Sequence, residues 1–368
     1  MSVLVVVAVI AALVFAGVAL AYVTGAAAVV TFFVSDSAEY LAVAPQRMFS
    51  QMDVFAIMAM PLFIWAGELM NRGGITRALI DMSMLLVGRM KGGLGHANVL
   101  ASVFFSGISG SAAADVAAMS NTFVPQMQRR GYDPLYAGAI TAASSVIGPI
   151  IPPSIIFILY GAIMGTDIAA LFIAGVVPGL LIAAVLMAMN AWMAYRENHP
   201  GGRPEDTPPW KPTLIAAAPA LVLPAIILGG IVFGVMTPIE AGAVAVVAAT
   251  VLGFWYGELD MRSFWECTQR TIVLSGVIFI FLAAGSLVSY LVALHQIADV
   301  VAEFVQSFGL TGMTYVIMLV IVFLILGMGV DTIVSLTLFV PLLVPAAIAQ
   351  GFDPVAIGVM VCLNLTLG

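Results

Sequence analysis

Long apolar stretches follow one another along nearly the whole chain, and few charged residues interrupt them. A helix of about 20 apolar residues is long enough to cross a hydrocarbon core roughly 30 Å thick. The stretches predict membrane-spanning helices at about 54–70, 135–165, 169–195, 213–234, 240–256 and 271–293. Residues 3–33 form a further apolar run, which is either one long span or two short ones.

Two other apolar stretches, 97–128 and 313–348, are interrupted by glycine near their centres. Each is long enough for two helices with a weak point between them, which predicts two re-entrant hairpins at about 97–130 and 313–350. The hydrophilic segment 196–211 divides the chain into an N-terminal half, 1–195, and a C-terminal half, 212–368.

The two halves resemble each other when the sequence is shifted by 220 positions. Residues 104–148 then lie over 324–368 without a gap, and both copies contain a G-[YF]-D-P turn. The matched pairs include Gly107 with Gly327, Pro125 with Pro345, Asp133 with Asp353, and Gly148 with Gly368. Matches in Gly, Asp and Pro at fixed spacing indicate an internal duplication.

The charges beside the two copies differ in sign. Arg72, Arg77, Arg89 and Lys91 precede the first copy, whereas no Lys or Arg lies in the corresponding region of the second. Positive charge near the ends of spans marks the cytoplasmic side. The copies are therefore predicted to face opposite sides of the membrane, and the 196–211 linker is predicted to be cytoplasmic. Inverted repeats of this kind are common in secondary transporters.

Composition supports a membrane protein and excludes other classes. The chain of 368 residues is 62% hydrophobic and only 8% charged, against roughly 25% charged residues in a soluble domain. The net charge of −7 without a basic cluster argues against a nucleic-acid partner. The predicted fold class is an all-α polytopic membrane protein in the lipid bilayer, with inverted repeats that each contain a re-entrant hairpin and a broken transmembrane helix.

Four short polar or proline-rich stretches are predicted to interrupt helices at membrane depth: 106–111, 146–154, 327–332 and a stretch beginning at 364–368. Non-helical backbone survives there only where protein or a water-filled cavity covers it. Unwound carbonyls and helix C-terminal ends coordinate Na⁺, and helix N-termini attract anions. An anionic substrate between the tips would meet Ser111 and Ala112 on one side, and Asp331 and Thr332 on the other.

Three runs, 45–75, 91–119 (KGGLGHANVLASVFFSGISGSAAADVAAM) and 148–154 (GPIIPPS), resemble the large membrane subunit of tripartite ATP-independent periplasmic (TRAP) transporters of the DctM/SiaM type. The resemblance extends over essentially the whole chain. It implies Na⁺-coupled uptake of organic anions such as C4-dicarboxylates or sialic acids, an elevator-type movement and a bacterial inner-membrane location. It also implies two partners, a small membrane (Q-type) subunit and a periplasmic substrate-binding protein.

The same resemblance suggests the Na⁺ ligands. One site would use Ser106, Ser109, Gly148, Ile151 and Pro152; Gly327, Val330 and Gly368 would contribute to the other. Members of the family continue past Gly368 with a second Pro-Pro break, so we expect this chain to be truncated at its C-terminus and its second site to be incomplete.

Other interpretations remain at this stage. Ser106, Ser109 and Ser111 also suit close helix packing, and Asp115 suits either a site or a helix cap. Asp133 and Asp353 are expected to start helices. A stand-alone ion-coupled anion transporter of the same architecture is the nearest alternative function. A remote one is an intramembrane serine protease using Ser109 with His295 or His96. We expect no enzyme activity.

Overall fold

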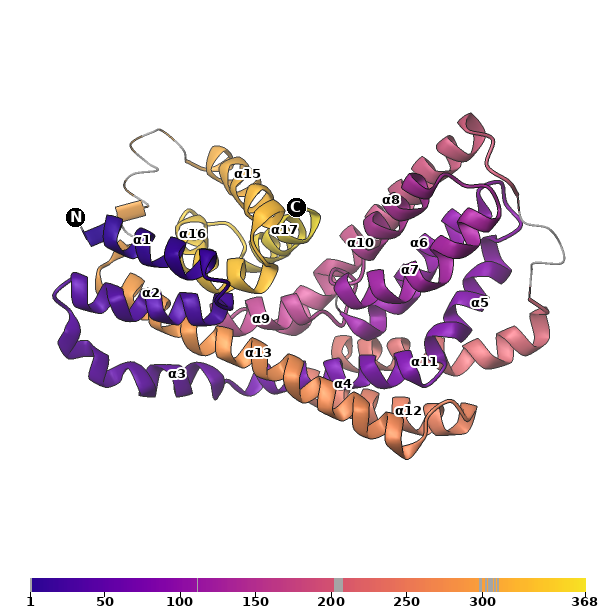
Figure 1. Cartoon of the computed structure of the whole chain (residues 1–368), viewed down its shortest axis with the longest axis horizontal. Helices are drawn as coiled ribbons and strands as arrows, with labels where there is room; N and C mark the ends of the chain where they lie inside the picture. Colours follow the sequence, from indigo (N-terminus) through magenta and orange to yellow (C-terminus); the bar gives the residue numbers. More distant parts are fainter. Residues whose placement is uncertain are drawn as a thin grey trace. The chain divides into compact units, whose positions relative to one another are not determined.

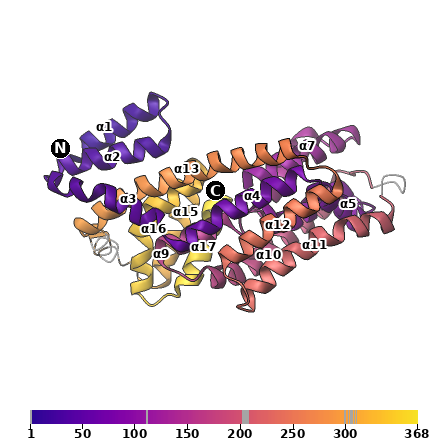
Figure 2. The ribbon, with the colours of Figure 1, turned by 90° about the horizontal axis from the view of Figure 1, so that it is seen from below.

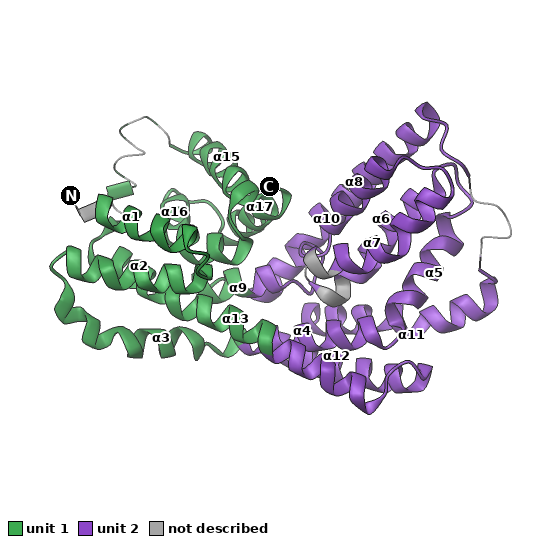
Figure 3. Cartoon of the chain, in the orientation of Figure 1, with its two compact units in different colours: residues 1–57, 159–167, 273–368 green, residues 58–158, 168–272 purple. Residues whose placement is uncertain are grey.

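Helices joined by short turns make up almost all of the regular structure in this computed structural model (Figure 1). The structure describes residues 2–110, 112–201, 208–297 and 311–368, together with 300, 301, 303, 307 and 309. The described chain divides into two units, each assembled from separate segments (Figure 3). Unit 1 comprises residues 1–57, 159–167 and 273–368, and unit 2 comprises residues 58–158 and 168–272.

Unit 1 holds both chain ends and the second predicted hairpin. Its elements are α1 (Ser2–Phe15), α2 (Leu20–Val34), the 3₁₀ turn η1 (Ala38–Val43), α3 (Ala44–Met52), α15 (Met313–Gly329), α16 (Thr332–Ala349) and α17 (Pro354–Leu367). Unit 2 holds the first predicted hairpin. Its elements are α4 (Ala59–Arg72), α5 (Ile75–Val87), α6 (Gly93–Ser109), α7 (Ala112–Arg129), α8 (Pro134–Ser145), α10 (Ile168–Arg196), α11 (Trp210–Val232) and α12 (Pro238–Tyr256). Three elements contribute residues to both units: η2 (Phe55–Met58), α9 (Ile155–Met164) and α13 (Met261–Leu294).

Among the described helices, α10, α11, α12, α13 and α16 are each long and apolar enough to cross a membrane. Shorter apolar helices, including α9, α15 and α17, accompany them. These helices confirm an all-α, multi-pass membrane protein. The predicted span at 54–70 differs in its start, because 55–58 form a 3₁₀ turn and the α-helix begins at Ala59.

The N-terminal apolar run consists of two helices. α1 ends at Phe15, and Gly17 has a φ of +74°, a left-handed conformation that glycine adopts without steric cost. α2 then begins at Leu20, and the two helices pack side by side (Figure 2). The sequence alone allowed either one span or two over residues 3–33, and the left-handed glycine separates them into two.

The G-[YF]-D-P turns have the same structure in both halves. Gly131 and Gly351 have φ values of +87° and +90°. Asp133 then caps α8 by accepting a hydrogen bond from the Leu135 N–H, and Asp353 caps α17 by accepting one from the Ala356 N–H. Pro follows each Asp at the first helical position, where its missing N–H costs nothing. These caps agree with the expected helix-starting role of both aspartates and with the predicted duplication.

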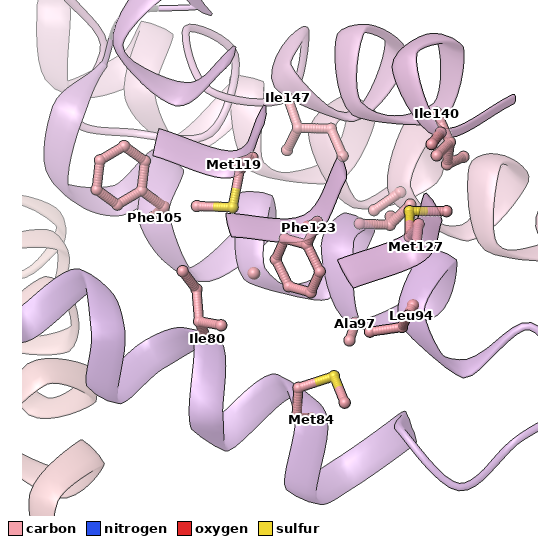
Figure 4. Packing of buried hydrophobic residues seen from close by; sticks show 14 of the residues in the cluster. Ile80, Met84, Leu94, Ala97, Phe105, Met119, Phe123, Met127, Ile140 and Ile147 are labelled. Carbon is pink, nitrogen blue, oxygen red and sulfur yellow. The ribbon is translucent and has the colours of Figure 1, made fainter. Parts of the chain in front are cut away.

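The core of unit 2 forms where α5, α6, α7, α8 and α10 meet. On α6, Ala97, Ala101 and Phe105 are buried at four-residue spacing, and Met119, Phe123 and Met127 repeat that spacing on α7. Residues four apart lie on one face of a helix, so the two faces pack together and against α5 (Figure 4). The apolar packing holds the α6–α7 hairpin to the helices around it.

Candidate functional site

The first hairpin consists of α6 and α7, and its tip is narrower than predicted. The stretch 106–111 was expected to be non-helical throughout, but α6 continues to Ser109. That expectation is wrong for 106–109, because a helix tolerates small residues and the Ser106 hydroxyl donates back to the Val103 carbonyl at 2.7 Å. Among the described residues of the tip, Gly110 leaves the helix, with a φ of +56°.

Gly110 brings the hairpin tip against the start of α9. A Cβ added to Gly110 would lie 2.8 Å from the Pro153 carbonyl oxygen and 3.2 Å from the Ile155 nitrogen. This approach is possible only without a side chain, and the positive φ also favours glycine. The end of α6 and the break between α8 and α9 are therefore adjacent, as expected if both contribute ligands to the first ion site.

The break itself follows the prediction. α8 ends at Ser145, turns occupy 146–153, and α9 begins at Ile155. Ser154 donates to the Pro149 carbonyl, and the Phe157 N–H donates to the Ser154 hydroxyl at 3.3 Å, so this serine caps α9.

Two glycines of α10 cover the break. A Cβ on Gly179 would lie 2.4 Å from Cγ1 of Ile151, and one on Gly175 would lie 2.8 Å from the Ile150 carbonyl. Small residues allow this close approach of backbones in membrane helices, and the irregular segment is thereby buried in protein.

The residues predicted for the first ion site come together in part. Gly148, Ile151 and Pro152 lie in the break, and Ser106 is fully buried in the last turns of α6. Ser109 is the last residue of α6, and its side chain lies outside the described part of the structure. Ser111 also lies outside the described residues, and Ala112 begins α7. The assignment of these residues to ion and substrate remains a prediction.

The second hairpin, α15 and α16, meets the end of α17 in the same way. A Cβ on Gly327 would lie 2.8 Å from the Leu365 carbonyl and 3.1 Å from Cα of Gly368. Two of the three residues predicted for the second ion site therefore touch. Val330, the third, lies in the short break between α15 and α16 with an extended backbone.

Two breaks of the second half are shorter than predicted. α15 remains helical to Gly329, so only Val330 and Asp331 separate it from α16. α17 remains helical to Leu367, and the predicted interruption over 364–367 is wrong. The Asn364 amide and the Thr366 hydroxyl donate to the carbonyls of Met360 and Cys362, so these polar side chains are accommodated within the helix.

Asp331 serves as the N-cap of α16. Its carboxylate accepts hydrogen bonds from the N–H groups of Ile333 at 2.9 Å and Val334 at 3.4 Å. Thr332 is the first residue of that helix. The cap explains why an acidic residue follows the break, and a substrate contact at Asp331 or Thr332 remains a prediction.

A seam of buried polar side chains runs between the hairpin and α8. It consists of Asn98, Ser102 and Ser106 on α6, Asp115 on α7, and Thr141, Ser144 and Ser145 on α8, none more than 1% exposed. The Asn98 amide donates to the Thr141 hydroxyl at 2.6 Å, and the Ser144 hydroxyl donates to the Asn98 carbonyl oxygen at 3.4 Å. We call these seven residues the polar seam.

Of the polar seam, only Ser106 and Asp115 are candidates from the sequence alone. The other residues were detectable as a pattern, because Asn98, Ser102 and Ser106 recur every four positions and so share one helix face. That this face is buried against α8 depends on tertiary packing, which the spacing does not specify.

The alternative role of Asp115 as a helix cap is wrong. Asp115 lies within the first turn of α7, but neither carboxylate oxygen has a hydrogen-bond partner among the described residues. The hydroxyls of Ser102 and Ser145 lie beside the carboxylate but do not have the geometry of a hydrogen bond to it.

A polar cavity of about 760 Å³ lies beside α7 in unit 2. Glu68 and Arg270 approach each other at its wall, with 3.5 Å between the Arg270 Nε and the Glu68 Oε1. The remaining lining is mostly polar or charged and includes Asn71, Thr76, Arg77, Asp81, Asn121, Thr122 and Gln126. The cavity therefore places charged and polar side chains beside α7 of the hairpin.

The geometry does not favour a serine protease. His96 precedes Ser109 by 13 residues on the same helix, α6, which separates them by about 20 Å at 1.5 Å per residue. A general base must lie within hydrogen-bond reach of its nucleophile. His295 belongs to unit 1, where its ring lies 3.4 Å from the Ser37 hydroxyl.

The apolar helices, the two hairpins and the helix breaks against their tips define a polytopic α-helical membrane transporter rather than an enzyme. Residues 6–368 match the family described as "Tripartite ATP-independent periplasmic transporter, DctM component". The chain belongs to this family, as the sequence resemblance predicted, and is a large permease component.

Individual relatives agree with this family. The chain is 36% identical over 330 residues to the sialic acid TRAP transporter large permease protein SiaM of Vibrio cholerae, covering 88% of this chain and 76% of the relative. It is 32% identical over 356 residues to the isethionate TRAP transporter permease protein DctMQ of Oleidesulfovibrio alaskensis, covering 96% of this chain and 56% of the relative.

A solved structure supports the fold. The crystal structure of the Alcanivorax borkumensis YdaH transporter, described as having an unusual topology, matches with a TM-score of 0.61 at 12% identity. The match covers 90% of this chain and 77% of the YdaH chain. At this level of identity the likeness concerns the fold alone.

Proposed function

We propose that this chain is the transport-conducting subunit of a Na⁺-coupled importer of organic anions that receives its substrate from a periplasmic binding protein. The observation that carries the proposal is the contact of each hairpin with a neighbouring helix end: Gly110 against Pro153, and Gly327 against Gly368. Helix breaks that face hairpin tips supply the carbonyl oxygens and helix ends that ions and anions use in secondary transporters.

Na⁺ is the coupling ion in this proposal. One ion would bind between the end of α6 and the α8–α9 break, with Ser106, Ser109, Gly148, Ile151 and Pro152 as the candidate ligands. The other would bind near Gly327, Val330 and Gly368. Hard oxygen ligands from hydroxyls and carbonyls suit an alkali cation better than nitrogen or sulfur ligands would.

The substrate in this proposal is an anion, and its candidate contacts are Ser111 and Ala112 of the first hairpin and Asp331 and Thr332 of the second. The named substrates of the relatives, sialic acid and isethionate, are both organic acids that are anionic at neutral pH. A bound Na⁺ beside the site lowers the cost of burying the anion's charge. C4-dicarboxylates fit the same requirement.

Two partners complete the proposed transporter. The family name describes a tripartite, periplasmic system in which DctM is one component. The name of the relative DctMQ suggests that it combines an M component with a Q component in one chain. We infer a small Q-type membrane subunit, a periplasmic binding protein, a location in the bacterial inner membrane and an elevator-type movement of the hairpin-bearing region.

Reconstitution tests this function. The full transporter, with its small subunit, is placed in vesicles, the binding protein is added outside, and uptake of a labelled organic anion is measured with and without an inward Na⁺ gradient. We expect uptake only when both the gradient and the binding protein are present. Uptake that ignores the gradient would contradict Na⁺ coupling, and uptake without the binding protein would favour a stand-alone transporter.

A further inference from the structure

Asp115 is a fully buried carboxylate for which the described residues provide no opposite charge. Its exposed fraction is 0%, and neither oxygen is hydrogen-bonded. The Ser102 hydroxyl beside it is equally buried and also has no partner among the described residues. The Ser145 hydroxyl, the third oxygen at this point of the polar seam, donates to the Thr141 carbonyl at 2.8 Å. Three helices thus direct oxygens to one buried point.

Among the described residues, the helices packed against α7 bring no titratable or charged side chain to this point. α6 carries His96, which lies six residues before Ser102, about 9 Å along the helix axis. α8 carries Tyr136, nine residues before Ser145 and so about 14 Å away. The cavity beside Ala117 and Ala118 is lined by Arg77 and Asp81 of α5 and by the ion pair of Glu68 and Arg270. Arg129 lies at the far end of α7.

The helix ends favour a positive charge between Asp115 and α8. Asp115 lies in the first turn of α7, where the partial positive charge of the helix N-terminus stabilises a carboxylate in its ionised form. Ser145 is the last residue of α8, whose C-terminus carries partial negative charge. An ionised carboxylate that is fully buried and faces such an end requires a cation or a proton.

We propose that Asp115, Ser102 and Ser145 form a binding site for one small monovalent cation, Na⁺ or a proton, that compensates the Asp115 charge during transport. The inference rests on the proposed ion-coupled function and adds a site to it. Ser102 lies one helical turn before Ser106, and Asp115 lies on the other helix of the hairpin. The Asp115 site therefore adjoins the proposed first ion site but shares none of its candidate ligands.

The experiment uses the full transporter with its small subunit and compares wild type, Asp115→Asn and Ser102→Ala. Asn keeps the shape of the side chain and removes its charge. Ala removes one oxygen without touching the charge, which keeps the proposal testable if Asp115→Asn fails to fold. Ser144→Ala is the matched control, because the Ser144 hydroxyl belongs to the same seam but bonds Asn98 and Thr141.

Thermal unfolding is measured in Na⁺ and in choline, each at mildly acidic and mildly alkaline pH. Wild type should be stabilised by Na⁺ or by acid. Asp115→Asn should unfold at a higher temperature than wild type in alkaline choline, because its buried charge is gone, and should lose the stabilisation by the cation. Ser102→Ala should weaken that stabilisation, and Ser144→Ala should preserve it.

Uptake assays distinguish the two cations. If Na⁺ binds at Asp115, the Na⁺ concentration for half-maximal uptake should rise about ten-fold or more in Asp115→Asn, with an unchanged pH profile. If a proton binds, the pH profile should flatten and the Na⁺ dependence should stay. An Asp115→Asn variant that keeps both responses of wild type would overturn the site. Wild-type uptake that ignores Na⁺ would instead contradict the proposed function, and the unfolding data would still report on Asp115.

Discussion

Gly327 and Gly368 touch through their backbones, since a Cβ on Gly327 would lie 3.1 Å from Cα of Gly368. Gly327 lies near the end of α15, and Gly368 follows α17. The contact therefore joins the second hairpin to the end of a helix, between residues 41 positions apart in the sequence. The equivalent positions in the first half are Gly107 and Gly148. Because the contact leaves no space for a methyl group, a substitution by alanine tests directly whether transport needs the contact between the hairpin and the neighbouring helix end.

Gly327→Ala should separate α15 from the end of α17. The added Cβ would lie 2.8 Å from the Leu365 carbonyl, and overpacking of this kind costs about 1–3 kcal/mol. We expect Na⁺-dependent uptake to fall sharply while the protein still inserts into the membrane. Gly329→Ala, two residues further along the same helix, is the control, because no atom lies within 4 Å of the position that its methyl group would take. Equal uptake by the two variants would contradict this role of Gly327.

Gly110→Ala should disable the first hairpin for two reasons. A left-handed conformation costs a non-glycine residue roughly 1–2 kcal/mol, and the new Cβ would press on the Pro153 carbonyl at 2.8 Å. We expect a loss of uptake and a lower unfolding temperature. The matched control is Gly138→Ala in α8, which has open space around it and should be neutral or stabilising by up to about 1 kcal/mol. Uptake by Gly110→Ala at the wild-type rate would show that the tip does not need this contact.

The hairpins and the α8–α9 break were predictable because their causes are local. Gly110 permits a left-handed turn, Pro149 removes a helix donor and Asp133 favours a helix start, and the 220-residue offset repeats Asp133 as Asp353 in the other half. The extent of each break was harder to predict. Ser106 and Thr366 lie within helices, where each hydroxyl bonds a carbonyl of the preceding turn. The same side chains also favour turns and caps, so the sequence alone does not decide between the two.

The polar seam was harder to predict from the sequence than the hairpins and the α8–α9 break. Ser102 and Ser145 are ordinary residues in apolar stretches, and only the packing of α6 against α8 brings them to Asp115. Asp331 shows the opposite case: its position before Thr332 is a usual N-cap pattern, and its two hydrogen bonds to α16 follow from that pattern. Local signals therefore predicted helix ends, and tertiary contacts decided which polar groups share a site.

Arg270→Gln should destabilise unit 2 by about 1 kcal/mol. Arg270 pairs with Glu68 at 3.5 Å, and the Glu68 side chain is only 13% exposed, so the change leaves a largely buried carboxylate without this partner. Arg262→Gln is the control on the same helix, because Arg262 is 88% exposed and its partner Glu266 also binds Arg72. That control should change stability by less than about 0.5 kcal/mol. Thermal unfolding in nanodiscs measures both, and a larger effect at Arg262 would contradict the importance of the Glu68 pair.

Ser106→Ala tests the first proposed ion site with little risk to the fold. The hydroxyl is fully buried and donates only to the Val103 carbonyl of its own helix, so alanine preserves the helix and removes one oxygen next to the tip. If Ser106 is a ligand, the Na⁺ concentration for half-maximal uptake should rise about ten-fold or more, with little change in the maximal rate at saturating Na⁺. Ser120→Ala on α7 is the control, since its hydroxyl also bonds a carbonyl three residues earlier in its own helix, at 3.4 Å and at a more exposed position. An unchanged Na⁺ dependence in Ser106→Ala would remove this serine from the ion site and leave it as a residue of close helix packing.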